Sequence, residues 1–408
     1  MRRSYLKCKL HHFSMMLVIA FISLMIWSCE SQNLSKLDEQ HISPTIVSTS
    51  TRSMKDAIKI AIDSRVSTRS TSEIENITPV TRFNDTTAYA INFSNDSGFI
   101  LVAANTHIAP VIGYSSTGSF SMENELAKKY VLDNLPSSTE NIASELIYDN
   151  CNAPVDELTH YKKEPIIKYS LGQRHPYNKV IDKYYPGCPA GCGPVAAAMA
   201  MSYCKEDLTW NGYYYNFQCI NQALSEGEGY IGGLSLNNIN INLEPQFEKP
   251  TPFPDPERII IFEDSYEGAT QAISQLLYEL GRLIGCTYTP DATSSKPENI
   301  INAVIQMGYN ASVLRPFDFD SMVENMSNNK IYFQCGYLKN SNVNGHGWVV
   351  DGYEYDESAD NQKKNCYIYC HWGWSGYSDG YYLIDALMPN PLNGYAVGSN
   401  FYIKMENN

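Results

Sequence analysis

The sequence predicts an α+β protein in which a small α+β unit precedes a larger part with helices first and strands after them. Alternation of apolar and polar residues, typical of half-buried strands, occurs within residues 88–114 and 331–384. Between these stretches, an Ala-rich run at 195–203 and apolar residues at helical spacing within 267–284 predict helices. Thirty Tyr and 25 Gly among few charged residues also indicate a β-rich, secreted protein.

Composition sets limits on the class of protein. The chain has 408 residues, of which 43% are apolar and 18% charged. This apolar fraction excludes wholesale disorder, and the length predicts roughly two to three domains. With 30 Lys and Arg against 44 Asp and Glu, the formal net charge is −14. An acidic chain without a basic block is repelled by phosphate backbones, so we expect no nucleic-acid partner.

Residues 1–29 have the pattern of an export signal. Residues 1–14 hold four cations and no acid, and Met15–Trp27 is an apolar run broken once. Such a run, as a helix of about 20 Å, is too short for a hydrocarbon core of roughly 30 Å. A cationic segment, a short apolar segment and a small residue are typical of a signal peptide. We therefore expect a cut after Ser28, with Cys29 as the new N-terminus.

The signal resembles that of bacterial lipoproteins, in which this cysteine carries the lipid. Trp27 departs from the pattern, because a small residue is common there. We expect an exported protein, which is either an outer cell envelope lipoprotein held to the membrane through Cys29 or a secreted protein. Residues 30–52 are rich in Ser and Thr and are predicted to form a tether.

Export places the remaining cysteines in an oxidising compartment. Of eleven cysteines, Cys8 leaves with the signal and Cys29 is expected to be lipidated, so nine remain. An odd number leaves at least one thiol unpaired, which invites a functional interpretation. If Cys192 is that thiol, the other eight allow too many pairings for the sequence to predict a disulfide connectivity.

Residues 53–164 are predicted to form the small α+β unit and a linker. The polar segment Asn152–Tyr169 is interpreted as exposed and as a natural cleavage region. In the unit we expect a helix at Met54–Val66, a hairpin of strands at Ala88–Phe93 and Phe99–Ala103, a strand at Val111–Tyr114 and a helix near Met122–Leu135.

Residues 165–408 are predicted to form the larger domain. It has long loops, Pro and Gly clusters and short strands. Here we expect helices at Val195–Tyr203 and Glu267–Ile284, followed by strands at Ile331–Gln334, Gly347–Val350, Cys366–Tyr369 and Gly380–Ile384.

Cys192 lies in the most informative segment, Gly187–Met201. Glycines on both sides of it permit a tight turn and close substrate approach. Pro194 suits the first turn of a helix, so Cys192 is predicted at a helix N-terminus. Unpaired amides and the positive dipole end there lower a thiol pKa and supply donors for an oxyanion. The segment alone also fits a disulfide with Cys188 or another cysteine, whereas Val195 excludes a Cys-x-x-Cys redox motif.

A thiolate nucleophile needs a base, and His346 is the candidate. It stands between two glycines at the start of an apolar strand, 346 − 192 = 154 residues after Cys192. This separation is comparable with that of papain-like enzymes. The imidazole would hold the thiolate as an ion pair and later protonate the leaving amine. Taken alone, a histidine flanked by glycines is more often structural.

The segment His371–Gly380 is the third unusual stretch. Trp372 and Trp374 on a loop between strands could form an apolar wall that orients an imidazole, or could simply pack in the core. Cys366, Cys370 and His371 suggest a metal site, but no second Cys/His pair at ligand spacing completes it. We therefore expect no metal.

Together these segments resemble the streptopain family of papain-fold cysteine peptidases. Gln173, upstream of Pro176-Tyr177-Asn178, is similar to that family's oxyanion-hole glutamine. The resemblance spans about residues 165–408, and Tyr89–Phe120 resembles the family's propeptide. It implies a papain-like catalytic domain, with a helical part and an antiparallel β part, preceded by a small α+β propeptide domain.

The resemblance also implies an activity. The chain would be an endopeptidase made as a zymogen, with its own propeptide as an intramolecular inhibitor. Cys192 would attack the scissile carbonyl, Gln173 and the Cys192 amide would hold the oxyanion, and His346 would transfer the proton. A thioester acyl-enzyme would then be hydrolysed, and the resemblance implies neither a metal nor an organic cofactor. Substrates would be peptides or unfolded protein segments, often with an apolar residue near the scissile bond.

One position departs from the family. An Asn commonly precedes the first Trp of Trp-Gly-Trp, where its amide orients the catalytic imidazole, and here this residue is His371. We take His371 and Trp372 as candidate site residues and expect His371 to be neutral when it orients His346, because two adjacent imidazolium groups repel. An inactive papain-fold binding protein and an acyl-transfer amidase or transpeptidase are the alternatives.

Overall fold

The computed structural model describes residues 51–67, 73–82, 84–123, 128–132, 135, 158–230, 259–314, 318–328, 330–337, 345–384 and 397–404. The predicted signal peptide, the lipidation site at Cys29 and nearly all of the tether lie outside the described residues. In the described part of the chain, no helix is both long enough and apolar enough to cross a membrane.

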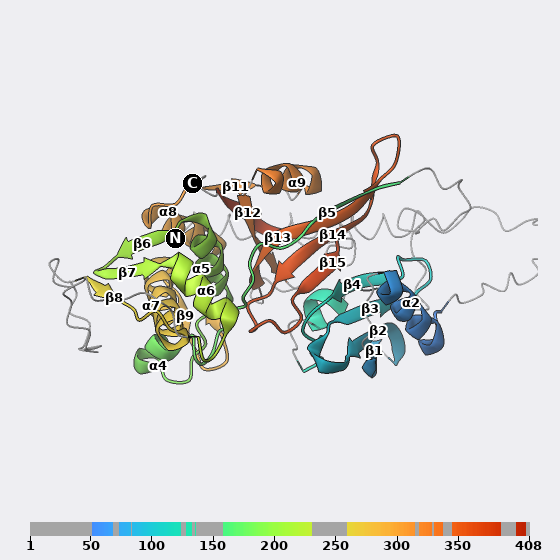
Figure 1. Ribbon diagram of the computed structural model, residues 1–408, viewed down its shortest axis with the longest axis horizontal. Helices are drawn as coiled ribbons and strands as arrows, with labels where there is room; N and C mark the ends of the chain where they lie inside the picture. The colour runs from blue at the N-terminus through green and yellow to red at the C-terminus, as the bar shows by residue number, and fades with distance from the viewer. Residues whose placement is uncertain are drawn as a thin grey trace, which may run out of the picture. The chain divides into compact units, whose positions relative to one another are not determined.

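Residues 51–135, called the N-terminal unit below, contain a helix that packs on antiparallel strands (Figure 1). Ala57 and Ala61 on α2 are fully buried and pack in one cluster with Ile91 and Val102 of the strands. The predicted first helix and three strands are confirmed, whereas only a π-helical turn is described within 122–135. The elements are α2 (Met54–Ser67), β1 (Ile74–Arg82), β2 (Asp85–Phe93), η1 (Ser94–Asp96), β3 (Phe99–Ala103), β4 (Val111–Ser115) and η2 (Lys128–Leu132).

Helices gather beside strands β12 and β13 in the larger part (Figure 1). The central one, α5, is buried from Val195 to Met201, as an Ala-rich, all-round apolar helix requires. The longest, α7, starts where the Ser265 side chain accepts a hydrogen bond from the Gly268 N–H. The helices are α4 (Lys179–Tyr184), α5 (Cys192–Cys204), α6 (Phe217–Glu226), α7 (Tyr266–Ile284), α8 (Pro297–Gln306) and α9 (Phe319–Ser327).

One antiparallel sheet runs through both parts of the described chain, in the order β1-β2-β3-β4-β15-β14-β13-β12-β16-β11. The N-terminal unit joins it where β4 pairs with β15, with Tyr114 opposite Tyr381. This mixture of helices and antiparallel strands confirms the predicted α+β class. The remaining strands are β5 (Thr159–Lys163), β6 (Asp207–Trp210), β7 (Tyr213–Asn216), β8 (Ile260–Ile261), β9 (Thr287–Tyr288), β10 (Thr293–Ser294), β11 (Ala311–Leu314), β12 (Lys330–Tyr337), β13 (Gly345–Glu357), β14 (Lys363–His371), β15 (Gly380–Leu383) and β16 (Val397–Lys404).

The polar segment 152–169 is not simply a linker. Its residues Thr159–Lys163 form β5, which pairs with the second half of β13. The Tyr161 ring stacks on Tyr355 with centroids 5.0 Å apart. Most β5 side chains are exposed, so the polarity that suggested a linker is that of an exposed strand.

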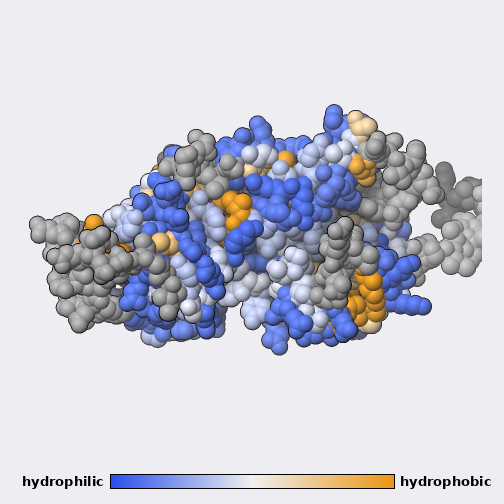
Figure 2. Space-filling view, viewed as in Figure 1, coloured by the Kyte–Doolittle hydropathy of each residue, from blue (hydrophilic) through white to orange (hydrophobic). Residues whose placement is uncertain are grey.

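Strand β13 separates two hydrophobic cores. Val349 packs with α4, α5, α6, α7 and α8, whereas Trp348 and Val350 pack with α9, β14, β15 and residues of the N-terminal unit. This follows from the alternation of side chains along a strand. The molecular face in Figure 2 is mostly hydrophilic, with scattered apolar patches.

Candidate active site

Cys192 is the first residue of α5, as predicted. Gly191 before it has a φ of 95°, a backbone conformation that favours glycine. A Cβ at this position would lie 2.8 Å from Cγ2 of Thr293, so the turn also leaves no space for a side chain. Cys188 and Cys192 are both free thiols, and they do not form the disulfide that the segment also permitted.

Three backbone N–H groups face the Cys192 sulfur, those of Cys192, Gly193 and Gly347. The first two belong to the start of α5, and the third lies next to His346 on β13. Burial raises the pKa of the Cys192 thiol, and the three N–H groups oppose this rise. The expectation of a lowered thiol pKa at the helix N-terminus is therefore wrong in the full chain. Desolvation of the sulfur raises the pKa of Cys192 by more than the three N–H donors lower it.

His346 is 3% exposed and lies against an aromatic cluster. Its ring stacks on that of Trp374, with centroids 4.8 Å apart. Its Nε2 lies 2.9 Å from the carbonyl oxygen of Trp372. Burial lowers the pKa of His346 to about 4, although the Trp372 carbonyl opposes the shift. The imidazole is neutral at pH 7, and because a carbonyl only accepts, Nε2 carries the proton.

The Trp-Gly-Trp loop packs as an aromatic wall. Trp372 is fully buried, and its ring lies parallel to that of Trp374, with centroids 5.2 Å apart and an interplanar angle of 5°. The ring of Trp348 also belongs to this wall, with its centroid 5.1 Å from that of Trp372. The loop therefore combines the two alternatives of the sequence analysis: its tryptophan rings pack in a hydrophobic core, and they also flank the His346 imidazole.

Gln173 lies beside the loop that leads into α5. Its carbonyl oxygen accepts a hydrogen bond from the N–H of Ala190 at 2.7 Å, two residues before Cys192. The next residue, Arg174, donates to the carbonyl of Gly187 at 2.9 Å. The structure therefore brings Gln173, Cys192 and the Gly347 backbone into one region.

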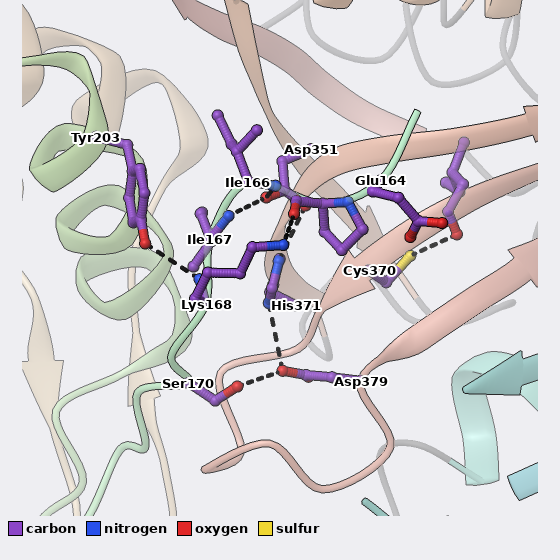
Figure 3. Close-up of polar contacts among 12 residues, drawn as sticks. Glu164, Ile166, Ile167, Lys168, Ser170, Tyr203, Asp351, Cys370, His371 and Asp379 are labelled. Carbon is purple, nitrogen blue, oxygen red and sulfur yellow. Dashed lines mark hydrogen bonds and ion pairs between the residues drawn. The ribbon is translucent and has the colours of Figure 1, made fainter. Parts of the chain in front are cut away.

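His371 does not contact His346 in the way we expected. Its Nε2 lies 2.9 Å from Asp351 Oδ1 and its Nδ1 3.4 Å from Asp379 Oδ2 (Figure 3). Val349 is its partner across the sheet, so His371 shares the face of Val349. His346 is three residues from Val349, an odd number that puts it on the opposite face of the pleat.

The charge of His371 also differs from the expectation. Burial lowers its pKa, but the carboxylates of Asp351 and Asp379 outweigh that effect and raise it to about 10. His371 is therefore an imidazolium at neutral pH. This corrects the prediction of a neutral His371 that orients His346; the group that holds His346 is the Trp372 carbonyl.

Asp351 and Asp379 are the residues that the sequence interpretation missed. They are 1% and 6% exposed. The available signal was the position of Asp351 directly after the apolar stretch Gly347–Val350, because a carboxylate in a buried strand needs a partner. Which partner it has depends on strand register, which no short motif contains.

Comparisons with known proteins identify both parts of the chain. Residues 171–382 match the Peptidase C10 family, and residues 50–142 match the Spi protease inhibitor. Streptopain of Streptococcus pyogenes serotype M28 is 27% identical over 347 residues, which cover 77% of this chain and 78% of that protein. Streptopain of serotype M1 is 26% identical over the same length and the same shares of the two chains.

Two solved structures are also similar. A fragment of Prevotella intermedia prointerpain A matches with a TM-score of 0.49 and 16% identity, covering 82% of this chain and 99% of that one. Active interpain A from the same organism gives a TM-score of 0.37 and 14% identity, covering 60% and 96%. The peptidase family match alone covers just over half of this chain. The chain therefore belongs to the Peptidase C10 family of cysteine peptidases and carries a propeptide inhibitor domain before the peptidase.

Proposed function

We propose that this chain is made as an inactive precursor and hydrolyses peptide bonds with Cys192 once it has matured. The observation that carries the proposal is the contact between the Cys192 sulfur and the N–H of Gly347, the residue after His346. The helix start that holds the candidate nucleophile therefore lies against the backbone next to the candidate base, which supports their assignment to one site. A neutral imidazole with its proton on Nε2 has Nδ1 as its basic nitrogen.

The chemistry follows from these groups. Nδ1 of His346 takes the thiol proton, and the Cys192 thiolate attacks the scissile carbonyl. The Gln173 side chain and the Cys192 N–H hold the oxyanion. The imidazolium then protonates the leaving amine, and water hydrolyses the thioester with His346 as base. The Nε2–H can donate to the Trp372 carbonyl in both charge states of His346, which explains how the site can lack the family's Asn.

Latency is supported by contacts of the N-terminal unit with the loop that carries Trp372 and with strand β14. The Ser378 N–H donates to the Ser119 carbonyl at 3.1 Å, and the Tyr367 hydroxyl donates to the Val111 carbonyl at 2.8 Å. Burial also raises the pKa of Cys192 and lowers that of His346, so both are uncharged in the full chain at neutral pH. An uncharged thiol is a weak nucleophile.

Strand β5 narrows the position of the maturation cut. We expected the cut within about 152–168, but Thr159–Lys163 pairs with β13. A protease needs an extended, accessible segment, and removal of β5 would also break its sheet pairing. We therefore place the cut before Thr159 and assign β5 to the mature enzyme. We also propose that the chain is exported. Cys29 carries the lipid if the signal is processed as in lipoproteins.

Two cysteine variants test the nucleophile. Cys192→Ala abolishes hydrolysis of a fluorogenic peptide and stops maturation, while Cys188→Ala, a buried thiol four residues earlier, keeps most of the activity. Electrophoresis follows maturation, and mass spectrometry of the products separates hydrolysis from peptide ligation. Equal loss of activity in both variants would refute the assignment of Cys192.

A further inference from the structure

Three charged side chains form a buried cluster that the proposed chemistry does not use. They are Asp351, His371 and Asp379, and the most exposed of them is 6% accessible. The imidazole lies between the two carboxylates, at 2.9 and 3.4 Å (Figure 3). Burying charged groups is costly unless they are paired and hydrogen-bonded. The contacts of the two carboxylates show what this arrangement holds.

Both carboxylates bind the segment that leads to Gln173. Oδ2 of Asp351 accepts hydrogen bonds from the N–H groups of Ile166 and Ile167, at 2.9 and 2.8 Å. Oδ2 of Asp379 accepts from the Ser170 hydroxyl at 2.7 Å (Figure 3). Residues 166–170 are thus fixed at both ends, directly upstream of Gln173.

The cluster also holds the backbone that supports His346. Oδ1 of Asp379 accepts a hydrogen bond from the Trp372 N–H at 2.9 Å. The carbonyl of the same Trp372 receives the His346 Nε2–H at 2.9 Å. One residue therefore separates the cluster from the imidazole of the candidate pair.

We propose that Asp351, His371 and Asp379 are positioning residues for the peptidase reaction. Together they fix the segment before Gln173 and the Trp372 backbone in one arrangement. His371 is the link, because it joins the carboxylate that holds Ile166 and Ile167 to the carboxylate that holds Ser170 and Trp372. No member of the cluster touches the reacting atoms. The inference rests on the proposed roles of Gln173 and His346.

The charge balance explains why a histidine serves here. Two carboxylates and one imidazolium leave a single net negative charge, which three backbone N–H groups and one hydroxyl stabilise. Replacing the imidazolium with a neutral side chain leaves two carboxylates that repel each other. The segment before Gln173 and the Trp372 backbone would then move apart.

The test measures kcat and KM for a fluorogenic peptide in the full chain after maturation. Reactive Cys192 is counted with a peptidyl epoxide, so kcat refers to competent sites only. His371→Gln lowers kcat roughly 10- to 100-fold, because small displacements of catalytic groups have effects of this size, and KM changes less than about threefold. The double variant Asp351→Asn, His371→Gln loses less kcat than the product of the two single-variant losses predicts. The reason is that Asp351→Asn removes one of the two carboxylate charges that His371→Gln leaves uncompensated.

His160→Gln is the matched control. His160 also contacts a carboxylate, with Nδ1 2.9 Å from Asp356 Oδ1, but its side chain is 54% exposed on β5 and holds neither Gln173 nor Trp372. Its kcat stays within about twofold of the parent. If His371→Gln does not fold, Asp379→Asn replaces it, because the amide oxygen still accepts from Trp372 while the charge is lost.

The outcomes are distinguishable. A parental kcat for His371→Gln, or a rise in KM together with additive losses in the double variant, overturns the positioning role. Failure of the epoxide to label Cys192 in the matured parent instead refutes the proposed nucleophile. The positioning role is supported if kcat of His371→Gln falls with KM preserved, the losses in the double variant are not additive, and His160→Gln keeps the parental kcat.

Discussion

His346 and His371 lie on neighbouring strands and each is 3% exposed, yet their pKa values move in opposite directions. Burial beside tryptophan rings lowers the pKa of His346 to about 4, although the Trp372 carbonyl opposes the shift. Two carboxylates hold that of His371 at about 10 against the same burial. The comparison teaches that the depth of a histidine does not determine its charge. Its role follows from the groups that face its ring nitrogens.

The largest expected effect concerns the neutral histidine. His346→Gln removes the base, so kcat/KM of the matured enzyme falls by roughly 10³-fold, within the usual range for general acid–base groups. The kcat/KM of His371→Gln falls less, because His371 acts on the reaction only through the residues that it positions. Peptide hydrolysis by both variants, assayed side by side at pH 7, checks the order. Equal losses would break the comparison and make His371 a catalytic group.

The stability of the full chain against pH gives the second prediction. The raised pKa of His371 means that its contribution is complete below pH 6.5 and is lost as pH rises through about 10. The lowered pKa of His346 means that its contribution is present above pH 6.5 and is lost as pH falls through about 4. His371→Gln should therefore flatten the alkaline side of the Tm profile, and His346→Gln the acid side.

Thermal unfolding from pH 4 to pH 10 measures both effects, which we expect to be roughly 5 °C. Besides Asp351 and Asp379, the titratable groups at His371 are Tyr369, with ring centroids 4.9 Å apart, and its chain neighbour Cys370. Burial raises the pKa of both, so they stay neutral in this range. Profiles that change on the same side in both variants would contradict the assignment of charges.

The smallest expected effect belongs to a third histidine. His160 also contacts a carboxylate, but more than half of its side chain is in water. Exposed pairs contribute little to stability, so His160→Gln should change the Tm at pH 7 by less than about 2 °C. A larger change, measured by calorimetry, would show that pairing rather than burial sets the strength of these contacts.

Particular residues show how far the sequence alone could predict this molecule. The Ala-rich run after Cys192 and the apolar spacing of 273–284 gave two helices, because such patterns are local. The strand Thr159–Lys163 was missed, since an exposed strand and a linker share the same polarity. The role of His371 was missed because it depends on the pairing of His371 with Val349 across the sheet. The sequence spacing suggests that Cys192 and His346 form a pair, but only the fold shows which face of the sheet each histidine side chain occupies.

The junction of β4 and β15 has a consequence for the mature enzyme. In the full chain β15 is an interior strand, with Tyr381 and Tyr382 opposite Tyr114 and Gly113. If maturation releases the N-terminal unit as proposed, the same strand becomes an edge, and its N–H and C=O groups need new partners. Water can serve, and so can any extended polypeptide. A strand of only four residues, Gly380–Leu383, limits the length over which such a chain could add to the sheet and so limits self-association.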